Sequence, residues 1–344
     1  MLQSAPNGGR RFPARLLLIL MNLVSLACLI WVLHDMNLAS LGEDISQMNW
    51  GWVAVAVIFD ISVYVWQGFR WSLLLAPIAA VPIWQSVRAI YVGLFANEIL
   101  PLRSGELIRC YLQARWSDLP FPVTLSSALI ERIFDGIWLT FLLVVTTRIT
   151  PLPKFLVDGG AILGIILLVA AAVLSVVMFS RHHAHRAAGS SKVLMKLRVL
   201  IDDLHAMGNS ASFYKSALAS LPHLLLQVMP IYALLHGYGL ELSLGAALAI
   251  TVILRLGTVV PQAPGNLGTF QALVVLSLSL FSVETAVAKR FSVVLWGVIT
   301  LPLLLAGFAA LLITGSRLRE LQRQAQRSFE SQPAVPEAKL GSDI

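Results

Sequence analysis

Long apolar blocks, separated by short polar segments, make up most of the chain. A helix needs about 20 apolar residues to cross a hydrocarbon core of roughly 30 Å. Six blocks meet this requirement and predict full membrane spans: 16–34, 51–76, 122–148, 158–180, 213–236 and 288–314. Two further apolar blocks, 84–115 and 243–283, are interrupted by Pro101 and Pro261. The pattern predicts an all-α polytopic membrane protein whose transmembrane domain covers residues 16–314.

The two interrupted blocks resemble each other and form a faint internal repeat. Each places an apolar half-helix before the pattern P-x-x-x-G, from Pro101 to Gly105 in the first and from Pro261 to Gly265 in the second. Lipid cannot satisfy the backbone groups freed at such a break, so breaks occur inside protein or beside a wet cavity. Paired interruptions in two halves of a chain point to a transporter's binding site. We expect two re-entrant hairpins related as an inverted repeat, in which Gly105, Gly265 and Gly268 permit close backbone approach and hinge motion. The alternative is two proline-kinked spans.

Lysine and arginine lie in segments that predict the cytoplasmic side of the membrane. Basic residues are concentrated in the N-terminal segment 1–15, the loop 181–212 and the tail 315–344, whereas the loop 35–50 has three acidic residues and no basic one. We expect both termini in the cytoplasm of a cell with a bacterial inner (plasma) membrane. The first interrupted block would then open to the cytoplasm and the second to the outside. The loop 181–212 also has an amphipathic pattern, which predicts a helix on the inner membrane surface or an ordinary connecting helix. The polar composition of the tail predicts a helix end followed by disorder.

The composition narrows the functional class. Hydrophobic residues make up 57% and charged residues 12% of the 344-residue chain, against roughly 25% charged in soluble domains. The formal net charge of +7 is better explained by an anionic membrane surface than by nucleic acid, because the charges lie between apolar blocks. Two cysteines without a CxxC pair give no basis for a disulfide framework or a zinc site. The sequence also lacks a Walker A motif, a nucleophile elbow, an HExxH pair and a Rossmann fingerprint. We therefore expect no cofactor, no metal and no familiar hydrolase or pump.

Charged residues within the block 122–148 are the strongest pointer to function. Glu131, Arg132 and Asp135 lie inside it, and Glu131 and Asp135, four residues apart, share a helix face. Charges at such depth cost roughly 2.5–3.5 kcal/mol each on insertion scales, so they must face the bundle interior and find partners. Three arginines are available as partners: Arg103, Arg109 and Arg255. Two explanations stay open. One is a closed ion-pair network that only fixes packing, and the other is a polar cavity that binds a charged head group or a proton.

Polar residues also lie beside the first break and in the second span. Asn97 and Glu98 precede the proline within the apolar half-helix, and Glu106 follows it. Arg70, close to two tryptophans, predicts an anchor that snorkels to the membrane interface. Asp60 lies deeper in the same span, and the sequence offers no explanation for it.

Three motifs carry a resemblance to a known family. They run from Asn97 to Arg109, from Glu131 to Asp135 and from Pro264 to Gln271. In this order they resemble the flippase-like transmembrane region of lysylphosphatidylglycerol synthases, over about residues 15–315. In the two-domain members of that family, the membrane region is associated with moving aminoacylated phosphatidylglycerol between leaflets, and a separate soluble domain makes that lipid. Because this chain ends about thirty residues after its last span, we expect a stand-alone member without the synthase domain.

The resemblance places the family's motif residues at defined positions of this chain. They are Asn97, Glu98, Arg103, Glu106, Arg109, Glu131, Arg132, Asp135, Gly265 and Gly268. The predicted substrate site consists of the eight charged or polar residues among these, together with Arg255 and Asn266. The predicted hinge set is Pro101, Gly105, Pro261, Gly265 and Gly268.

These observations predict a membrane protein that binds a phospholipid or polyprenyl-linked lipid, or moves it between leaflets. Arg103 and Arg109 would engage phosphate, and Glu131 and Asp135 would pair with these arginines or with a cationic head group. Membrane lipids are the expected partners. One alternative is a membrane enzyme acting on lipid head groups, which needs a nucleophile or a metal that the sequence does not show. The other is a non-transporting partner of a glycosyltransferase or lipid-modifying enzyme.

Overall fold

A computed structural model describes residues 12–34, 36–100, 104–179, 208, 210–258, 264–315 and 317–330. Within these ranges the chain is helical and contains no β-strand. Its helices, in chain order, are α1 (Phe12–His34), α2 (Leu38–Gln47), α3 (Trp50–Leu75), α4 (Ile83–Ile99), α5 (Gly105–Trp116), α6 (Phe121–Ile149), α7 (Lys154–Phe179), α10 (Ala211–Leu226), α11 (Val228–Gly237), α12 (Leu244–Gly257), the 3-10 helix η2 (Pro264–Asn266), α13 (Thr269–Ser279), α14 (Thr285–Thr314) and α15 (Leu318–Glu330).

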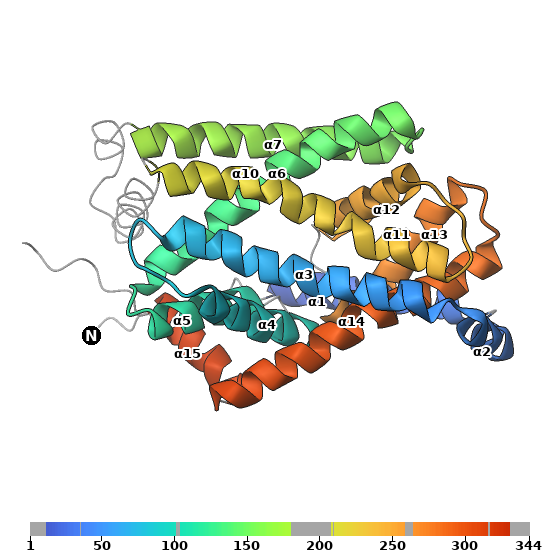
Figure 1. Cartoon of the computed structure of the whole chain (residues 1–344), viewed down its shortest axis with the longest axis horizontal. Helices are drawn as coiled ribbons and strands as arrows, with labels where there is room; N and C mark the ends of the chain where they lie inside the picture. The colour runs from blue at the N-terminus through green and yellow to red at the C-terminus, as the bar shows by residue number, and fades with distance from the viewer. Residues whose placement is uncertain are drawn as a thin grey trace, which may run out of the picture.

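Four helical segments are long and apolar enough to cross a membrane: α3, residues 154–172 of α7, the α10–α11 pair and α14. A fifth candidate arises when α1 and α2 are taken together as one bent span. Helix α6 has 29 residues and is therefore about 43 Å long at 1.5 Å per residue. It is long enough to cross a membrane but is not counted among these apolar segments, because it carries the charged residues 131, 132 and 135. The long helices run side by side along the long axis of the molecule (Figure 1), as expected of a polytopic all-α membrane protein.

The predicted span 213–236 contains one interrupted helical turn. Helix α10 ends at Leu226 and α11 begins at Val228, while Gln227 between them keeps right-handed helical backbone angles. Pro230, three residues further on, has no N–H to donate to the preceding turn. The two helices together are long and apolar enough to form one span, and Gln227 lines a cavity inside the bundle.

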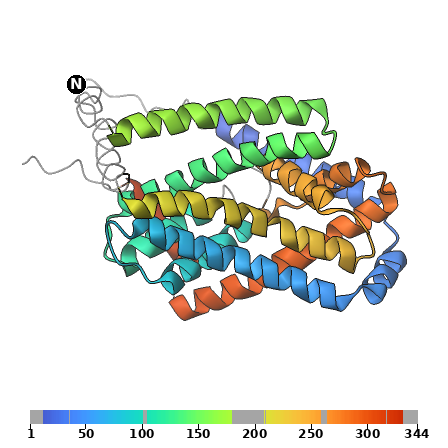
Figure 2. The same ribbon diagram turned by 45° about the horizontal axis from the view of Figure 1, so that its top comes forward.

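The two interrupted blocks form two pairs of short helices, which we call the first hairpin (α4 and α5) and the second hairpin (α12, η2 and α13). The helices of each hairpin pack against each other. They contain 17, 12, 14 and 11 residues, and the three shortest reach about 16–21 Å, less than a hydrocarbon core. Figures 1 and 2 place α4 and α5 at one end of the molecule and α12 and α13 toward the other. This arrangement agrees with two re-entrant hairpins that enter from opposite sides. The breaking prolines, Pro101 and Pro261, lie outside the described residues.

Two segments outside the predicted spans contain helices. The loop 35–50 contains α2, whose start is capped by the Asn37 side chain, which accepts a hydrogen bond from the Ala39 backbone N–H at 2.9 Å. Its Asp44 is held by the Tyr238 hydroxyl and by Arg290 Nε at 2.5 Å. The predicted tail contains α15, which packs against α5. The amphipathic part of the loop 181–212 and the residues 331–344 lie outside the described ranges.

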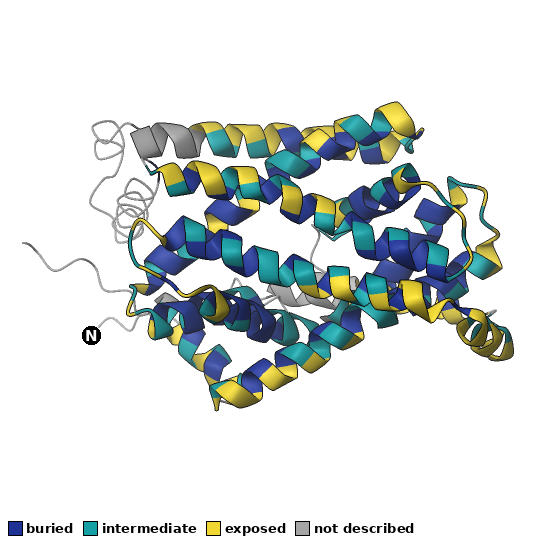
Figure 3. Ribbon diagram, in the orientation of Figure 1, coloured by how far each residue is buried: buried dark blue, intermediate teal, exposed yellow. Residues whose placement is uncertain are grey.

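Apolar side chains divide between an inner core and the outer faces of the bundle. One buried cluster gathers around α3 to α6 and another around α11 to α14. Figure 3 shows buried residues on the inward faces and exposed residues on the outward faces of the long helices. The exposed residues include large apolar ones such as Leu305 and Ile313 on α14 and Ile165 on α7. A surface of this kind suits hydrocarbon and not water.

Candidate functional site

Three charged side chains on three helices form a buried chain of ion pairs. Arg70 of α3 donates from Nη2 to Glu131 Oε1 of α6 at 3.2 Å, and Arg109 of α5 donates from Nη1 to Glu131 Oε2 at 2.9 Å. Arg70 and Glu131 have no exposed surface, and Arg109 is also buried. The Arg109 guanidinium lies 4.7 Å from the centre of the Trp71 ring, which adds a cation–π contact. The free-energy cost of removing such charges from water is offset only when each charge makes several well-formed bonds. Glu131 meets this condition, since it accepts from both arginines.

Three further charges close this chain into a ring. Glu106 accepts from Arg109 Nε at 2.8 Å and from Arg132 Nη2 at 3.0 Å. Arg132 Nη1 lies 3.6 Å from Asp135 Oδ2, and Asp135 accepts from Arg70. This outer half is accessible, since Glu106 is 38% exposed and Arg132 50% exposed. We call the complete set the charge ring; its members are Arg70, Glu106, Arg109, Glu131, Arg132 and Asp135. Each member has two partners of opposite charge, and the formal charges sum to zero.

The charge ring decides between several predictions about the buried charges. Glu131 and Asp135 face the bundle interior from one side of α6, as predicted, and Arg109 is a partner of Glu131. The interpretation of Arg70 as an interfacial anchor is wrong, because its side chain is fully buried and bonds both acids. An arginine inside an apolar block could have been weighed as a partner in the same way as Arg255. Arg103 lies outside the described residues, so its predicted role is not tested.

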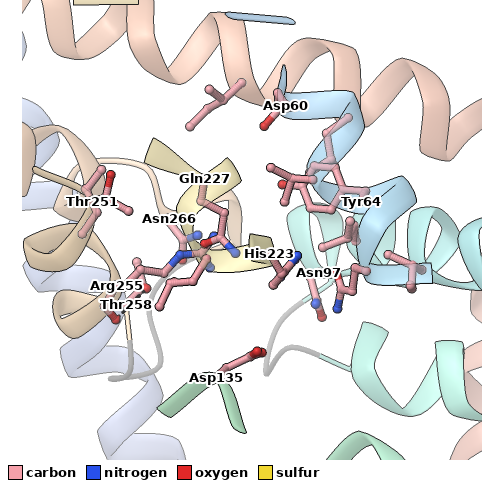
Figure 4. Close-up of a pocket in the computed structure, with 18 of the residues that line it drawn as sticks. Asp60, Tyr64, Asn97, Asp135, His223, Gln227, Thr251, Arg255, Thr258 and Asn266 are labelled. Carbon is pink, nitrogen blue, oxygen red and sulfur yellow. Dashed lines mark hydrogen bonds between the residues drawn. The ribbon is translucent and has the colours of Figure 1, made fainter. Parts of the chain in front are cut away.

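A cavity of about 560 Å³ opens between the two hairpins and the long helices α3, α6, α10, α11 and α14. From the first hairpin, Asn97 and Glu98 line it, and from the second, Arg255 and Asn266. Four members of the charge ring face the same space: residues 106, 109, 132 and 135. Figure 4 shows Asp135 on α6 and Asn266 beside η2 turned toward this common space. The cavity therefore brings together predicted site residues that lie far apart in the sequence.

The glycines of the two breaks let backbones approach closely. A Cβ atom on Gly105 would overlap the carbonyl oxygen of Gly93, and Asn97 Oδ1 accepts a hydrogen bond from the Gly105 N–H at 2.9 Å. Gly265 and Gly268 have φ angles of +71° and +86°, a region that favours glycine. The close backbone approach expected at these glycines is present at Gly105 and Gly268, whereas Gly265 meets only side-chain atoms at ordinary contact distances. Hinge motion stays a prediction. Asn97 fixes the turn of the first hairpin as well as lining the cavity.

Arg255 differs from every arginine of the charge ring. Its side chain is exposed in the cavity, and among the described residues its guanidinium makes no ion pair or hydrogen bond. Arg109 also keeps a spare donor, since its Nη2 has no hydrogen-bond partner within the described part of the chain. Guanidinium groups bind phosphate and carboxylate oxygens through paired N–H donors. The cavity therefore offers cationic donors that the rest of the described site does not use.

Several cavity residues were not included in the predicted site. Asp60 and Tyr64 line it from α3, and His223 and Gln227 line it from the α10–α11 span (Figure 4). Asp60 was visible in the sequence as an unexplained buried charge. His223 and Gln227 carried no signal, because which face of this span lines the cavity depends on how its helices pack against their neighbours.

Comparison with known proteins gives a family and two relatives. Residues 17–307 match the family described as the lysylphosphatidylglycerol synthase transmembrane region. A UPF0104 membrane protein of Methanothermobacter thermautotrophicus is 23% identical over 267 residues, covering 72% of this chain and 78% of that protein. The glycosyltransferase AglD of Haloferax volcanii is 23% identical over 245 residues, covering 60% of this chain and 39% of that protein. The chain therefore spans about two fifths of the length of AglD.

Proposed function

The chain belongs to the lysylphosphatidylglycerol synthase transmembrane family, and from this premise we propose that it binds a membrane lipid by its phosphate group and moves it between leaflets. The observation that carries the proposal is Arg255, which lies in the cavity between the two hairpins and has no ion-pair or hydrogen-bond partner among the described residues. In this proposal the molecule lies in a bacterial inner membrane with both ends of the chain in the cytoplasm, as the basic segments predict.

The position of the cavity supports movement rather than simple attachment. The first hairpin lies toward one end of the bundle, the second toward the other, and both contribute cavity wall. A site between broken helices from opposite sides can be reached from either leaflet when one hairpin shifts against the other. Leu139 and Leu167 add an apolar part to the same wall, which suits the start of an acyl chain.

The charges of the cavity support a phosphate ligand. The charge ring is neutral, so its members supply little net attraction for an ion. Arg255 adds a positive charge in surroundings of low dielectric constant, where an electrostatic contact is stronger than in water. The exposed edge of the ring between Arg132 and Glu106 offers a second contact, in which a lipid phosphate takes the place of the Glu106 carboxylate.

Reconstitution into vesicles tests the proposal. Phospholipids labelled on an acyl chain are placed in both leaflets, and a membrane-impermeant quencher then reports lipid arriving from the inner leaflet. Arg255→Gln should slow this arrival by roughly 10- to 100-fold, the equivalent of losing a charged hydrogen bond of about 1.5–3 kcal/mol. Arg148→Gln is the matched control, because Arg148 is exposed on α6 and lies outside the cavity wall. Equal rates for the two variants would contradict the proposal.

A second candidate function is a docking role beside a lipid-linked sugar enzyme. It is favoured by the similarity to part of a protein named as a glycosyltransferase. A docking role predicts that purified protein moves no lipid and that Arg255→Gln leaves the partner's activity unchanged. Analysis of the vesicle lipids after the assay covers the enzymatic alternative, since breakdown of a phospholipid or polyprenyl lipid would reveal it.

A further inference from the structure

Asp60 is a buried carboxylate that the charge ring does not include. It lies within the spanning helix α3, is only 7% exposed, and lines the cavity. Its Oδ2 atom has no hydrogen-bond partner among the described residues. A carboxylate taken out of water without a donor is costly. The protein keeps such a group next to an open cavity, so the missing donor is expected to come from a ligand.

The surroundings of Asp60 supply charge but no bonded donor. The ionisable groups that line the same cavity are Tyr64 on its own helix, Glu98 on α4, Glu106 and Arg109 on α5, Arg132 and Asp135 on α6, His223 on α10 and Arg255 on α12. The four residues from α5 and α6 are already paired within the charge ring. The described residues of α11 and α14 contribute no ionisable side chain to this wall. Arg255 is the cation of the wall outside the ring, and no ion pair joins it to Asp60 within the described structure.

Another acceptor in the same cavity also lacks a donor. The Oε1 atom of Gln227 is buried without a hydrogen-bond partner among the described residues. In Figure 4, Asp60 and Tyr64 on α3 lie across the cavity from Arg255 and Thr258 on the α12 side. Among the described residues, Asp60 Oδ2 therefore lacks a donor, and across the cavity from it the Arg255 guanidinium lacks an acceptor. A ligand that satisfies both groups carries a negative group at one end and N–H donors at the other.

We propose that the cavity takes a zwitterionic head group, with its phosphodiester on Arg255 and a primary ammonium group on Asp60. This inference rests on the proposed function and names the class of lipid. A primary ammonium has three N–H donors, one of which would satisfy Asp60 Oδ2. A lipid with only a negative head group satisfies Arg255 but leaves Asp60 unpaired, and this difference gives selectivity.

Two acyl-chain-labelled probes, phosphatidylethanolamine and phosphatidylglycerol, test the proposal in vesicles of phosphatidylcholine. The measured quantity is the ratio of their rates of movement by the full chain. The wild type should move phosphatidylethanolamine faster. Asp60→Asn should lower the ratio by about tenfold, as expected for a lost charged hydrogen bond, while phosphatidylglycerol still moves. Asp158→Asn, at an exposed aspartate of α7 outside the cavity, should leave the ratio unchanged.

Two additional measurements keep the result interpretable. Asp60→Glu retains the carboxylate and should recover part of the preference, which separates loss of the charge from loss of folding. Native mass spectrometry of the detergent-purified protein with each lipid measures head-group preference without any transport. Soluble phosphoethanolamine, added as a competitor, should displace the lipid only weakly. Displacement as effective as that by the lipid itself would assign the site to a water-soluble ligand and overturn the lipid assignment.

The outcomes separate the two proposals. If the wild type binds phosphatidylethanolamine selectively but moves no lipid, the head-group inference stands and the transport proposal fails. If lipids move but Asp60→Asn leaves the ratio unchanged, the head-group inference is overturned and transport stands. Equal slowing of both lipids by Asp60→Asn also overturns it, because the carboxylate then serves the transport cycle and not the head group.

Discussion

The charge ring and the pair of residues Asp60 and Arg255 line the same cavity but differ in how their charges are compensated. Every ring member has two partners, and the ring is neutral. Asp60 Oδ2 and the Arg255 guanidinium have no bonding partner among the described residues. A closed neutral ring stabilises its own members, whereas separated opposite charges leave a field for a ligand to satisfy. The two explanations for buried charge, a packing network and a binding cavity, are therefore not exclusive: the ring is a closed network, and four of its members also line the cavity.

The largest effect on stability is expected from the centre of the ring. Glu131→Gln keeps the shape of the side chain but leaves Arg70 and Arg109 buried with reduced compensation. Breaking a buried pair in this way costs about 3–5 kcal/mol, which should appear as a markedly lower melting temperature of the purified protein in detergent. Glu241→Gln is the control, since Glu241 is exposed. A Glu131→Gln melting temperature equal to that of the control would show that the ring does not hold the helices together.

The second hairpin should instead depend on backbone fit. Gly268 has a positive φ, and a Cβ atom there would overlap the carbonyl oxygen of Ser25 on α1. Gly268→Ala should therefore destabilise the protein by roughly 2–3 kcal/mol through strain and overpacking. Gly159→Ala, in a helix with open space around it, should be neutral or slightly stabilising. Unfolding curves of the two variants that coincide would show that α1 and α13 do not meet in this way.

A smaller effect is expected at the exposed edge of the ring. Glu106→Gln removes a carboxylate that is 38% exposed, and both Arg109 and Arg132 retain another acidic partner. Exposed ion pairs contribute about 1 kcal/mol or less, so the melting temperature should fall much less than in Glu131→Gln. Equal melting temperatures for the two variants would show that buried and exposed members of the ring contribute equally to stability, which contradicts the contrast between its inner and outer halves.

The sequence predicted the parts of this molecule that depend on local pattern. Apolar blocks of sufficient length predicted the spanning helices, and the prolines and glycines at 101, 105, 261 and 265 predicted the two breaks. The spacing of Glu131 and Asp135 predicted their common inward face. Arg70 was misplaced because its burial depends on how α3 packs against α5 and α6, which the pattern along one helix does not contain.

The site illustrates the same limit. Arg255 and Asn266 were predicted as site residues and do line the cavity. Arg255 was also expected as a partner of the acids in α6, and it makes no ion pair among the described residues. Asp60 carried a signal, a charge deep in an apolar block, without a partner that the sequence could name. Its meaning depends on which helices face α3 across the cavity, and only the three-dimensional arrangement supplies that.

The claim that Arg255 holds the lipid phosphate can be tested by measuring lipid binding to Arg255→Gln. Native mass spectrometry can compare phosphatidylglycerol with diacylglycerol, which has the same acyl chains and no phosphate, on the wild type and on this variant. We expect the wild type to prefer the phosphate-bearing lipid and Arg255→Gln to lose most of this preference, while the melting temperature of the variant matches that of Arg148→Gln. An unchanged preference for the phosphate-bearing lipid in Arg255→Gln would contradict the claim that this arginine holds the lipid phosphate.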